Sequence, residues 1–479
     1  MRKSLIVILL GLFFATNAQP PGRFLGKWGG DGDDIGYSVK QTLDGQYIIA
    51  GSSSSYGTHG NTDVYLTKLD TMGFVIWHKF YGGTSNEVGK SVIQLPDSGY
   101  VIAGFTNSYG AGGYDAIIIK VDKNGDMLWQ RTFGGSDWDF ASDLVFASDG
   151  NLFVVGNTSS FGSGKKDGFV LKYDVSGNLL LQKFVGGAEN DELQSIINTN
   201  DNFLATVGYT ESRGEINGDG YFLKLNLNAD TIFTTTFGGP YKDYACDLVQ
   251  KDAGQGDAYY LGGAMTPSAN AKTHSYMYRI SPTGTFLSAA DEFRNADNEE
   301  FISVANSKHH SYLTAFVRST IVGGKSMQEE IFIAYVTGFS FLVNDGGYFD
   351  HEYVYSVEAT RDKGYITVGS TDGYGSVGKD ILFIKRDSAV VNYETITSIP
   401  LLTLRQSPII SYQDESIIID PNRDDLEQIE ICDMMGNKIF NQITSQKQYR
   451  IDISTYPHSI YIVTIKYKNG GIYSEKFIH

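Results

Sequence analysis

A pair of adjacent glycines returns along most of this chain at a nearly constant interval, and this interval restricts what the chain can fold into. The successive steps between pairs are 53, 52, 52 and 52 residues, followed by a double step of 108 residues. The pairs lie at Gly29-Gly30, Gly82-Gly83, Gly134-Gly135, Gly186-Gly187, Gly238-Gly239 and Gly346-Gly347. A period of this length is typical of repeat proteins, in which each unit is one small supersecondary structure. The double step contains a degenerate unit, with Phe293-Arg294-Asn295 in place of Phe-Gly-Gly, so we count seven units.

Each unit contains four short apolar segments separated by Gly, Asn, Asp and Ser, which is the pattern of strands joined by turns. In the second unit the predicted strands are Lys90 to Leu95, Tyr100 to Thr106, Ala116 to Val121 and Met127 to Phe133. Seven four-stranded units predict an all-β fold, a seven-bladed β-propeller, in which radial repetition leaves only short sheet edges.

The two ends of the repeat array complement one another. The last unit supplies three strands, ending with Ile381 to Arg386, but no fourth strand. Arg23 to Trp28 has the pattern of a fourth strand with no unit before it. We therefore predict that residues 23–28 close the last blade and that the propeller spans residues 20–388. The alternative is an open β-solenoid, which would leave half a unit at each end.

The composition restricts the partners of this fold. With 479 residues, of which 41% are apolar, the chain can bury a large core, and we expect two domains. The 55 acidic side chains outnumber the 38 basic ones and give a formal net charge of -17. Because such a protein repels phosphate backbones and anionic membrane surfaces, we expect no nucleic-acid partner.

The amino end has the pattern of a targeting segment. Arg2 and Lys3 precede the apolar stretch Leu5 to Phe14, and Ala15-Thr16-Asn17-Ala18 offers small residues for cleavage. This pattern predicts a signal peptide at residues 1–19 that is removed on export. The apolar stretch is too short to span a bilayer, and we expect no transmembrane segment elsewhere.

The carboxyl end differs from the repeats. Residues 389–411 have the mixed composition of a linker. Residues 412–479 contain alternating segments with hairpin turns at Met435-Gly436-Asn437 and Lys468-Asn469-Gly470. About seventy residues of this kind predict a small β-sandwich.

This last segment resembles a known export domain. It contains Asp420-Pro421-Asn422, then IEICDMMGNKIF from Ile429, IDIST from Ile451, SIYIVTIK from Ser459 and the ending SEKFIH. In this order the motifs resemble the type A sorting domain of the type IX secretion system of Bacteroidota, although Ser459 stands where that family usually has Gly. The resemblance implies that the type IX machinery is a partner and that the protein reaches the outer-membrane surface or the extracellular space. The alternative is an ordinary immunoglobulin-like accessory module.

The repeats are similar to a bacterial β-propeller repeat family of secreted proteins. They share the phrase D-x-x-G-x-x-x-W, which runs from Asp70 to Trp77 and from Asp122 to Trp129. Asp and Gly suit a tight turn, and we interpret the bulky residue that follows as a wedge between blades.

An acidic residue follows each glycine pair by four positions, with a one-residue insertion in the last unit. These acids are Asp34, Glu87, Asp139, Asp191, Asp243, Glu299 and Glu352. We predict that they form a ring around one mouth of the central channel. Such a ring could hold Ca²⁺ or meet sugar hydroxyls, but we favour a structural role in which each acid accepts backbone N–H bonds from the glycine turn.

The loops between the second and third strands carry the candidate ligand-binding residues. Tyr56, Tyr109, Phe161 and Tyr374 each stand beside a glycine at matching positions in four units. Exposed rings could stack on sugars, whereas rings folded back would only cover the blade ends.

No catalytic motif emerges from the sequence. The eight histidines have no metal-ligand spacing, and we find no nucleophile elbow or phosphate-binding loop. We therefore predict no catalytic residue and no cofactor, with Ca²⁺ as an open possibility and any metal site unknown. The expected function is that of a secreted, surface-displayed, monomeric module that binds extracellular glycan or protein, and is not an enzyme. The alternative is a propeller-fold lyase or glycosidase that acts on extracellular polysaccharide.

Overall fold

The structure is a computed structural model. It describes residues 24–56, 61–214, 217–251, 258–266, 274–291, 298–305, 312–322, 325–337, 339–344, 352–372 and 378–386, and strands between residues 401 and 478. These residues form strands, turns and bends but no helix, so none of them belongs to a helix that could cross a membrane. The predicted signal peptide lies outside the described residues.

The prediction of an all-β propeller is confirmed. Six blades, rather than seven, are each built from one stretch of chain with four consecutive strands. The first three are β2 (Asp34–Gln41), β3 (Tyr47–Ser53), β4 (Asp63–Leu69), β5 (Val75–Tyr81); β6 (Glu87–Gln94), β7 (Tyr100–Thr106), β8 (Asp115–Val121), β9 (Met127–Phe133); and β10 (Asp139–Phe146), β11 (Leu152–Thr158), β12 (Asp167–Tyr173), β13 (Leu179–Val185). The next three are β14 (Asp191–Asn198), β15 (Leu204–Thr210), β16 (Asp219–Leu225), β17 (Thr231–Phe237); β18 (Asp243–Gln250), β19 (Tyr259–Met265), β20 (His274–Ile280), β21 (Phe286–Asp291); and β22 (Asn298–Ala305), β23 (Tyr312–Val322), β24 (Lys325–Thr337), β25 (Phe339–Asn344).

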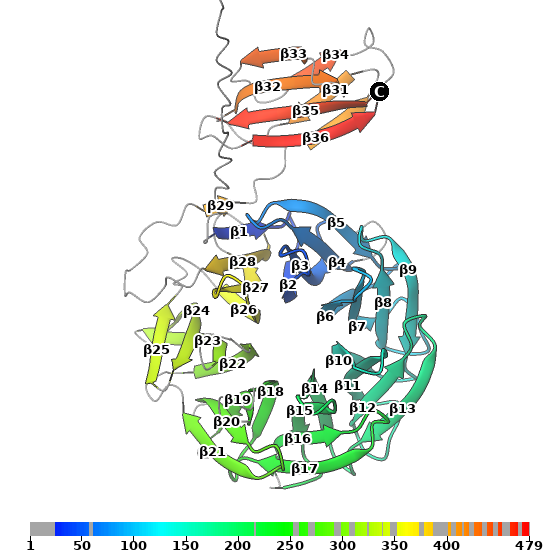
Figure 1. Cartoon of the computed structure of the whole chain (residues 1–479), viewed down its shortest axis with the longest axis vertical. Helices are drawn as coiled ribbons and strands as arrows, with labels where there is room; N and C mark the ends of the chain where they lie inside the picture. The colour runs from blue at the N-terminus through cyan, green and yellow to red at the C-terminus, as the bar shows by residue number, and fades with distance from the viewer. Residues whose placement is uncertain are drawn as a thin grey trace, which may run out of the picture.

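The remaining sheet of the ring is composite, because it takes strands from both ends of the propeller. Its order is β26 (Glu352–Ala359), β27 (Tyr365–Thr371), β28 (Asp380–Arg386), β1 (Phe24–Trp28) and β29 (Leu401–Thr403). Strand β1 runs antiparallel to β28, with Trp28 opposite Ile381. The predicted closing strand is therefore found, and in Figure 1 the composite sheet fills the gap between β22 to β25 and β2 to β5.

The first strand of each blade lies nearest the central axis and the fourth lies at the rim, as Figure 1 shows. The second and third strands are almost fully buried, as in β3 and β4, where every residue is buried. One hydrophobic cluster combines Ile48 and Leu66 with Val92, Ile102 and Ile119 of the next blade. The core thus lies between blades, because each sheet buries both faces against its neighbours.

The wedge interpretation of the repeated phrase is confirmed. The ring of Trp77 packs on Gly125, which lies in the turn between β8 and β9 of the next blade. A Cβ on that glycine would meet the ring at 3.0 Å. Gly125 also has φ of 82°, a conformation that side chains disfavour. The composite blade makes the same contact between Phe24 and Gly73, so Phe24 is the wedge of the closing strand.

The carboxyl-terminal part contains two sheets, which fit the predicted β-sandwich. One has three strands and the other four. They consist of β30 (Ile409–Gln413), β31 (Ser416–Asp420) and β34 (Tyr449–Asp452), and of β33 (Lys438–Ile443), β32 (Leu426–Asp433), β35 (Ile460–Tyr467) and β36 (Ile472–Ile478). Ile429, Ile431 and Val463 are fully buried in the second sheet.

Candidate functional site

The predicted acidic ring lies at the seams between blades, where each acid starts an innermost strand. The five acids whose side chains are described, Asp34, Glu87, Asp139, Asp191 and Asp243, are at most 1% exposed. Each accepts a hydrogen bond from the N–H of the second glycine of its pair, as Asp139 does from Gly135 at 2.8 Å. Hydroxyl groups also donate to them, for example Ser160 to Asp139 at 2.7 Å. These contacts match the structural role that we favoured; the side chains of Glu299 and Glu352 lie outside the described set.

A second acid, which the sequence analysis overlooked, completes the five seams whose glycine pairs the structure describes. It starts the third strand of the preceding blade, and its carboxylate lies against the first glycine of the pair. A Cβ on Gly134 would lie 1.9 Å from Asp115 and 2.7 Å from Asp139. Only glycine fits between two carboxylates this close, which explains why the pair returns in the sequence. Burial, with a smaller contribution from Asp139, raises the pKa of Asp115.

The predicted aromatic candidates partly cover these seams. The hydroxyl group of Tyr109 donates to the carbonyl oxygen of Gly82 at 2.8 Å, and Tyr56 makes the equivalent bond at 3.1 Å. Tyr56, Tyr109 and Phe161 are nevertheless 44%, 40% and 39% exposed. They close the blade ends and present the rest of each ring to solvent. Tyr374 lies outside the described residues.

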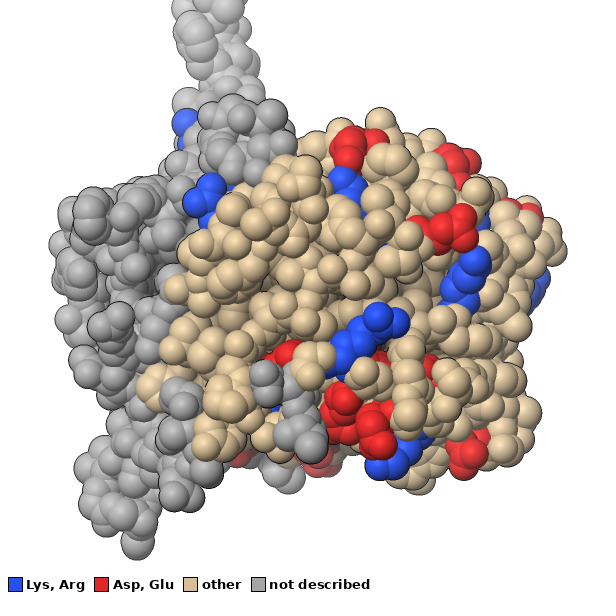
Figure 2. All heavy atoms as spheres, turned by 90° about the horizontal axis from the view of Figure 1, so that it is seen from below, with Lys and Arg blue, Asp and Glu red and all other residues tan. Residues whose placement is uncertain are grey.

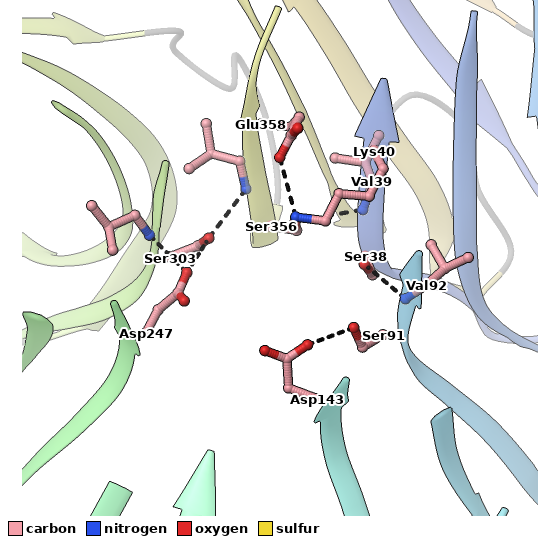
Figure 3. A network of polar contacts seen from close by, with 12 residues as sticks. Ser38, Val39, Lys40, Ser91, Val92, Asp143, Asp247, Ser303, Ser356 and Glu358 are labelled. Carbon is pink, nitrogen blue, oxygen red and sulfur yellow. Dashed lines mark hydrogen bonds and ion pairs between the residues drawn. The ribbon is translucent and has the colours of Figure 1, made fainter. Parts of the chain in front are cut away.

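A hydrogen-bonded ring that the sequence did not suggest joins the innermost strands. Its members occupy the position four residues after each acid: Ser38, Ser91, Asp143, Ser195, Asp247, Ser303 and Ser356. Ser91 donates to Asp143 at 2.6 Å, and Ser303 donates to Asp247 at 2.8 Å. Backbone N–H groups complete the circle, including that of Val39, which donates to Ser356 at 3.4 Å across the closure (Figure 3).

One serine in this ring lies between two carboxylates. Ser195 Oγ lies 3.0 Å from Asp143 and 2.9 Å from Asp247. A hydroxyl group has one proton to donate, so it can serve only one of two ionised carboxylates. Burial raises the pKa of Asp247, with Asp143 adding to the effect, which favours a proton on that carboxyl. The neighbouring Lys40 pairs with Glu358 at 3.1 Å, and this carboxylate raises the pKa of Lys40 (Figure 3).

Each innermost strand also contains a β-bulge just before the ring residue. The extra residues are Tyr37, Lys90, Ser142, Gln194, Cys246, Ile302 and Tyr355. A bulge leaves one residue out of the ladder and redirects its side chain. Unlike the seam and ring positions, the bulge positions carry a different residue type in almost every blade.

Three of the bulge residues meet where the innermost strand β2 packs against β6 and against β26 of the composite sheet. Lys90 Nζ lies 3.9 Å from the ring centre of Tyr37, and the rings of Tyr37 and Tyr355 are 4.9 Å apart. Tyr353 stands 6.4 Å from Tyr355 with nearly parallel rings, and Lys379 Nζ lies 4.9 Å from the ring of Tyr353. We call Tyr37, Tyr355 and Tyr353 the tyrosine strip; a lysine contacts each of its ends.

The titration of the strip residues is shifted by burial. Burial lowers the pKa of Lys90 to about 8 and raises that of Tyr37 to about 12. Lys90 therefore carries a positive charge in surroundings that disfavour it.

A second aromatic cluster lies across blades two and three. It consists of Phe105, Tyr114, Trp138 and Phe140, and we call it the Trp138 patch. Phe105 and Phe140 are 5.0 Å apart, and Trp138 stands edge-on to Tyr114 at 6.1 Å. Trp138 is 59% exposed. The sequence analysis missed this patch because its residues come from three separate segments.

Several charged side chains elsewhere form ion pairs. Figure 2 shows acidic and basic side chains next to one another on the outer surface. Rim pairs such as Lys183 with Asp230 at 2.9 Å join neighbouring blades. No group of three or more metal-ligating side chains occurs in the described part of the chain. Ca²⁺ binding by the acidic ring, the alternative to its structural role, is untested.

A comparison with protein families identifies the carboxyl-terminal segment. Residues 413–479 match the family "Secretion system C-terminal sorting domain". The sorting domain predicted from the motifs is thereby confirmed, and its presence implies that the chain is secreted.

The chain also resembles other proteins. Over an alignment of 185 residues the chain is 29% identical to a regulatory protein, FlaEY, of Caulobacter vibrioides. The match covers 33% of this chain and 19% of that relative, so most of the relative lies outside it. Among solved structures, virginiamycin B lyase of Staphylococcus aureus is 10% identical with a TM-score of 0.47 and covers 75% of this chain and 99% of that one. PorZ, a surface component of the type IX secretion system of Porphyromonas gingivalis, is 11% identical with a TM-score of 0.35. That match covers 90% of this chain and 58% of PorZ.

Proposed function

We propose that this protein is a secreted, surface-displayed propeller that binds extracellular glycan without chemically altering it. The proposal depends on one observation, the exposed Trp138 patch. The repeat does not account for Trp138, because the residues at the same place in other blades are polar: Asp33, Asn86, Asn190 and Lys242. Blade packing therefore needs no aromatic residue there, and an indole ring that is 59% exposed is available to a ligand.

The chemistry of the Trp138 patch suits a sugar. Aromatic rings pack against the apolar face of a pyranose, while neighbouring polar groups bond its hydroxyls. Ser136 and Asp137 precede Trp138 and are exposed, and Asn107 follows Phe105 at the surface. A protein ligand would need a larger continuous interface than this small patch and its polar border provide.

Export supports the same assignment. We propose that the sorting domain, residues 412–479, delivers the propeller through the type IX machinery, after a signal peptide at 1–19 has brought it across the inner membrane. The propeller, residues 20–388, would then face the medium as a monomer, anchored or released. Residues 389–411 would be the linker, and its strand β29 packs on the composite sheet. The Bacteroidota origin is part of this proposal.

The alternative, an enzyme that acts on polysaccharide, has one observation in its favour. The tyrosine strip places Tyr37 and Tyr355 near Lys90, which resembles a general base beside a cation. A general base works best when its pKa lies near the working pH. The pKa of Tyr37 is raised to about 12, so this phenol keeps its proton at neutral pH, which favours binding over catalysis.

A glycan array with the mature chain tests the proposal. We expect Trp138→Ala to weaken binding to the recognised glycan at least about tenfold. Leu128→Ala is the matched control, because Leu128 is also a large apolar residue, 57% exposed, on the rim strand β9. Equal loss in both variants, or no glycan bound by the parent, would contradict the proposal.

A further inference from the structure

The two lysines beside the tyrosine strip differ from the other lysines of the blades. Five lysines of the third strands each pair with an aspartate of their own blade, at 2.5 to 3.1 Å: Lys68, Lys120, Lys172, Lys224 and Lys385. Lys90 and Lys379 instead contact tyrosine rings. Among the side chains that the structure describes, neither ammonium group lies within ion-pair distance of a carboxylate.

The strip itself is not explained by the repeat. Tyr37 and Tyr355 are bulge residues, and the corresponding residues in blades three and four are Ser142 and Gln194. The fold thus requires no aromatic ring at this position. All three tyrosines and both lysines are half-buried.

From this arrangement we propose that the tyrosine strip is a binding site for an acidic glycan, a short uronic-acid oligosaccharide. Its sugar rings pack on the tyrosine rings, and its carboxylates pair with Lys90 and Lys379. This inference depends on the proposed function, because it names the class of glycan.

Charge and position both support an acidic ligand. Lys90 is desolvated without a compensating anion among the described side chains, and a carboxylate at this place would supply one. The strip also continues toward the Trp138 patch: β6, which carries Lys90, packs against β10, which carries Phe140. Phe140 and Tyr353 each follow the seam acid of their blade, so both clusters lie at the same end of the innermost strands.

The chain as a whole sets a limit on the ligand. With a net charge of -17, the protein repels a long polyanion at a distance. A short oligosaccharide keeps its charge near the two lysines, where the attraction is local.

Calorimetric titration of the mature chain with two matched probes tests the inference. The probes are tri-galacturonic acid and its fully methyl-esterified form, which differ only in charge. We expect the acid to bind at least about tenfold more tightly than the ester at pH 7. Lys90→Met should remove that preference, whereas Lys123→Met, on an exposed turn, should keep it.

The pH dependence gives a second readout. Because the pKa of Lys90 in the free protein is about 8, affinity for the acid should fall as the pH rises above 8, by up to about tenfold per pH unit, while affinity for the ester stays level. Equal affinity for acid and ester, or no binding of the acid, overturns the inference. The array with Trp138→Ala decides the proposed function separately, because a neutral glycan that binds at the Trp138 patch would leave that function intact.

Discussion

The seams between blades and the bulges of the innermost strands lie a few residues apart, yet they follow opposite rules. At each described seam a glycine pair meets a carboxylate in the same geometry, from Asp34 to Asp243. At the bulges almost every blade carries a different residue type. A repeated geometry requires a repeated side chain, whereas a position outside the ladder accepts any residue. In this protein, the positions that the repeat leaves free are therefore the places to look for specific function.

The largest effect should follow from removing the closing strand, the seam that joins both ends of the propeller. Deleting residues 20–28 leaves β28 with an unpaired edge and removes Phe24 from Gly73 and Trp28 from its stack on Tyr65, at 4.2 Å. We expect a loss of several kcal/mol in unfolding free energy, or failure to fold, by calorimetry.

Deleting residues 412–479 is the matched control for this experiment. We expect the propeller transition to remain near its original temperature and the truncated protein to stay in the periplasm. A propeller that melts normally without residues 20–28 would refute the closure.

Within a seam, replacing the acid should destabilise the propeller without touching the bulges. Asp139→Asn and Asp191→Asn leave neutral acceptors for the N–H groups of Gly135 and Gly187, and we expect a loss of about 1–3 kcal/mol each. Asp137→Asn, at an exposed site, should change little. A parent protein whose melting temperature rises strongly with millimolar Ca²⁺ would instead show that the acids hold a cation.

Two tryptophans separate the structural from the free positions. Trp129 packs on Gly177, and its Nε1 donates to the carbonyl oxygen of Val175 at 3.1 Å, so Trp129→Ala should lower stability by about 2–4 kcal/mol. Trp138→Ala should change it by less than about 0.5 kcal/mol, because the ring is mostly exposed. Chemical denaturation of both variants measures the difference, and equal losses would contradict the contrast.

Replacing the bulge residue Lys90 by Met should give a small gain in stability. Burial lowers the pKa of Lys90 to about 8 from about 10.5, so the charged form destabilises the fold at pH 7. Between pH 8 and about 10.5 the unfolded chain binds more protons than the folded one, and stability of the parent should rise with pH. Lys90→Met should be more stable by about 1 kcal/mol at pH 7 and lack that rise. A variant less stable than the parent at pH 7 would indicate that Lys90 supports the fold.

What the sequence predicted and what it missed follow the same division. The repeat, the closure, the wedges and the five described seam acids were predictable because each depends on local spacing that returns about every fifty residues. The hydrogen-bonded ring through Asp143 and Asp247 was not predictable. Its positions carry either Ser or Asp, and only the fold shows that these side chains bond one another. The bulges could not be predicted because they depend on strand register. The Trp138 patch could not be predicted because it forms only when two neighbouring blades pack together. The roles of Glu299, Glu352 and Tyr374 remain predictions.

The closure across the ends also sets the order of events in folding. Phe24 pairs with Lys385, almost the whole length of the propeller away. Contacts between such distant segments form late, because a long loop must be ordered first. A chain that is still emerging from the ribosome or from a membrane pore has no partner for its first strand. The composite sheet can therefore form only after nearly the whole propeller has emerged. Until then the two ends of the propeller stay unpaired.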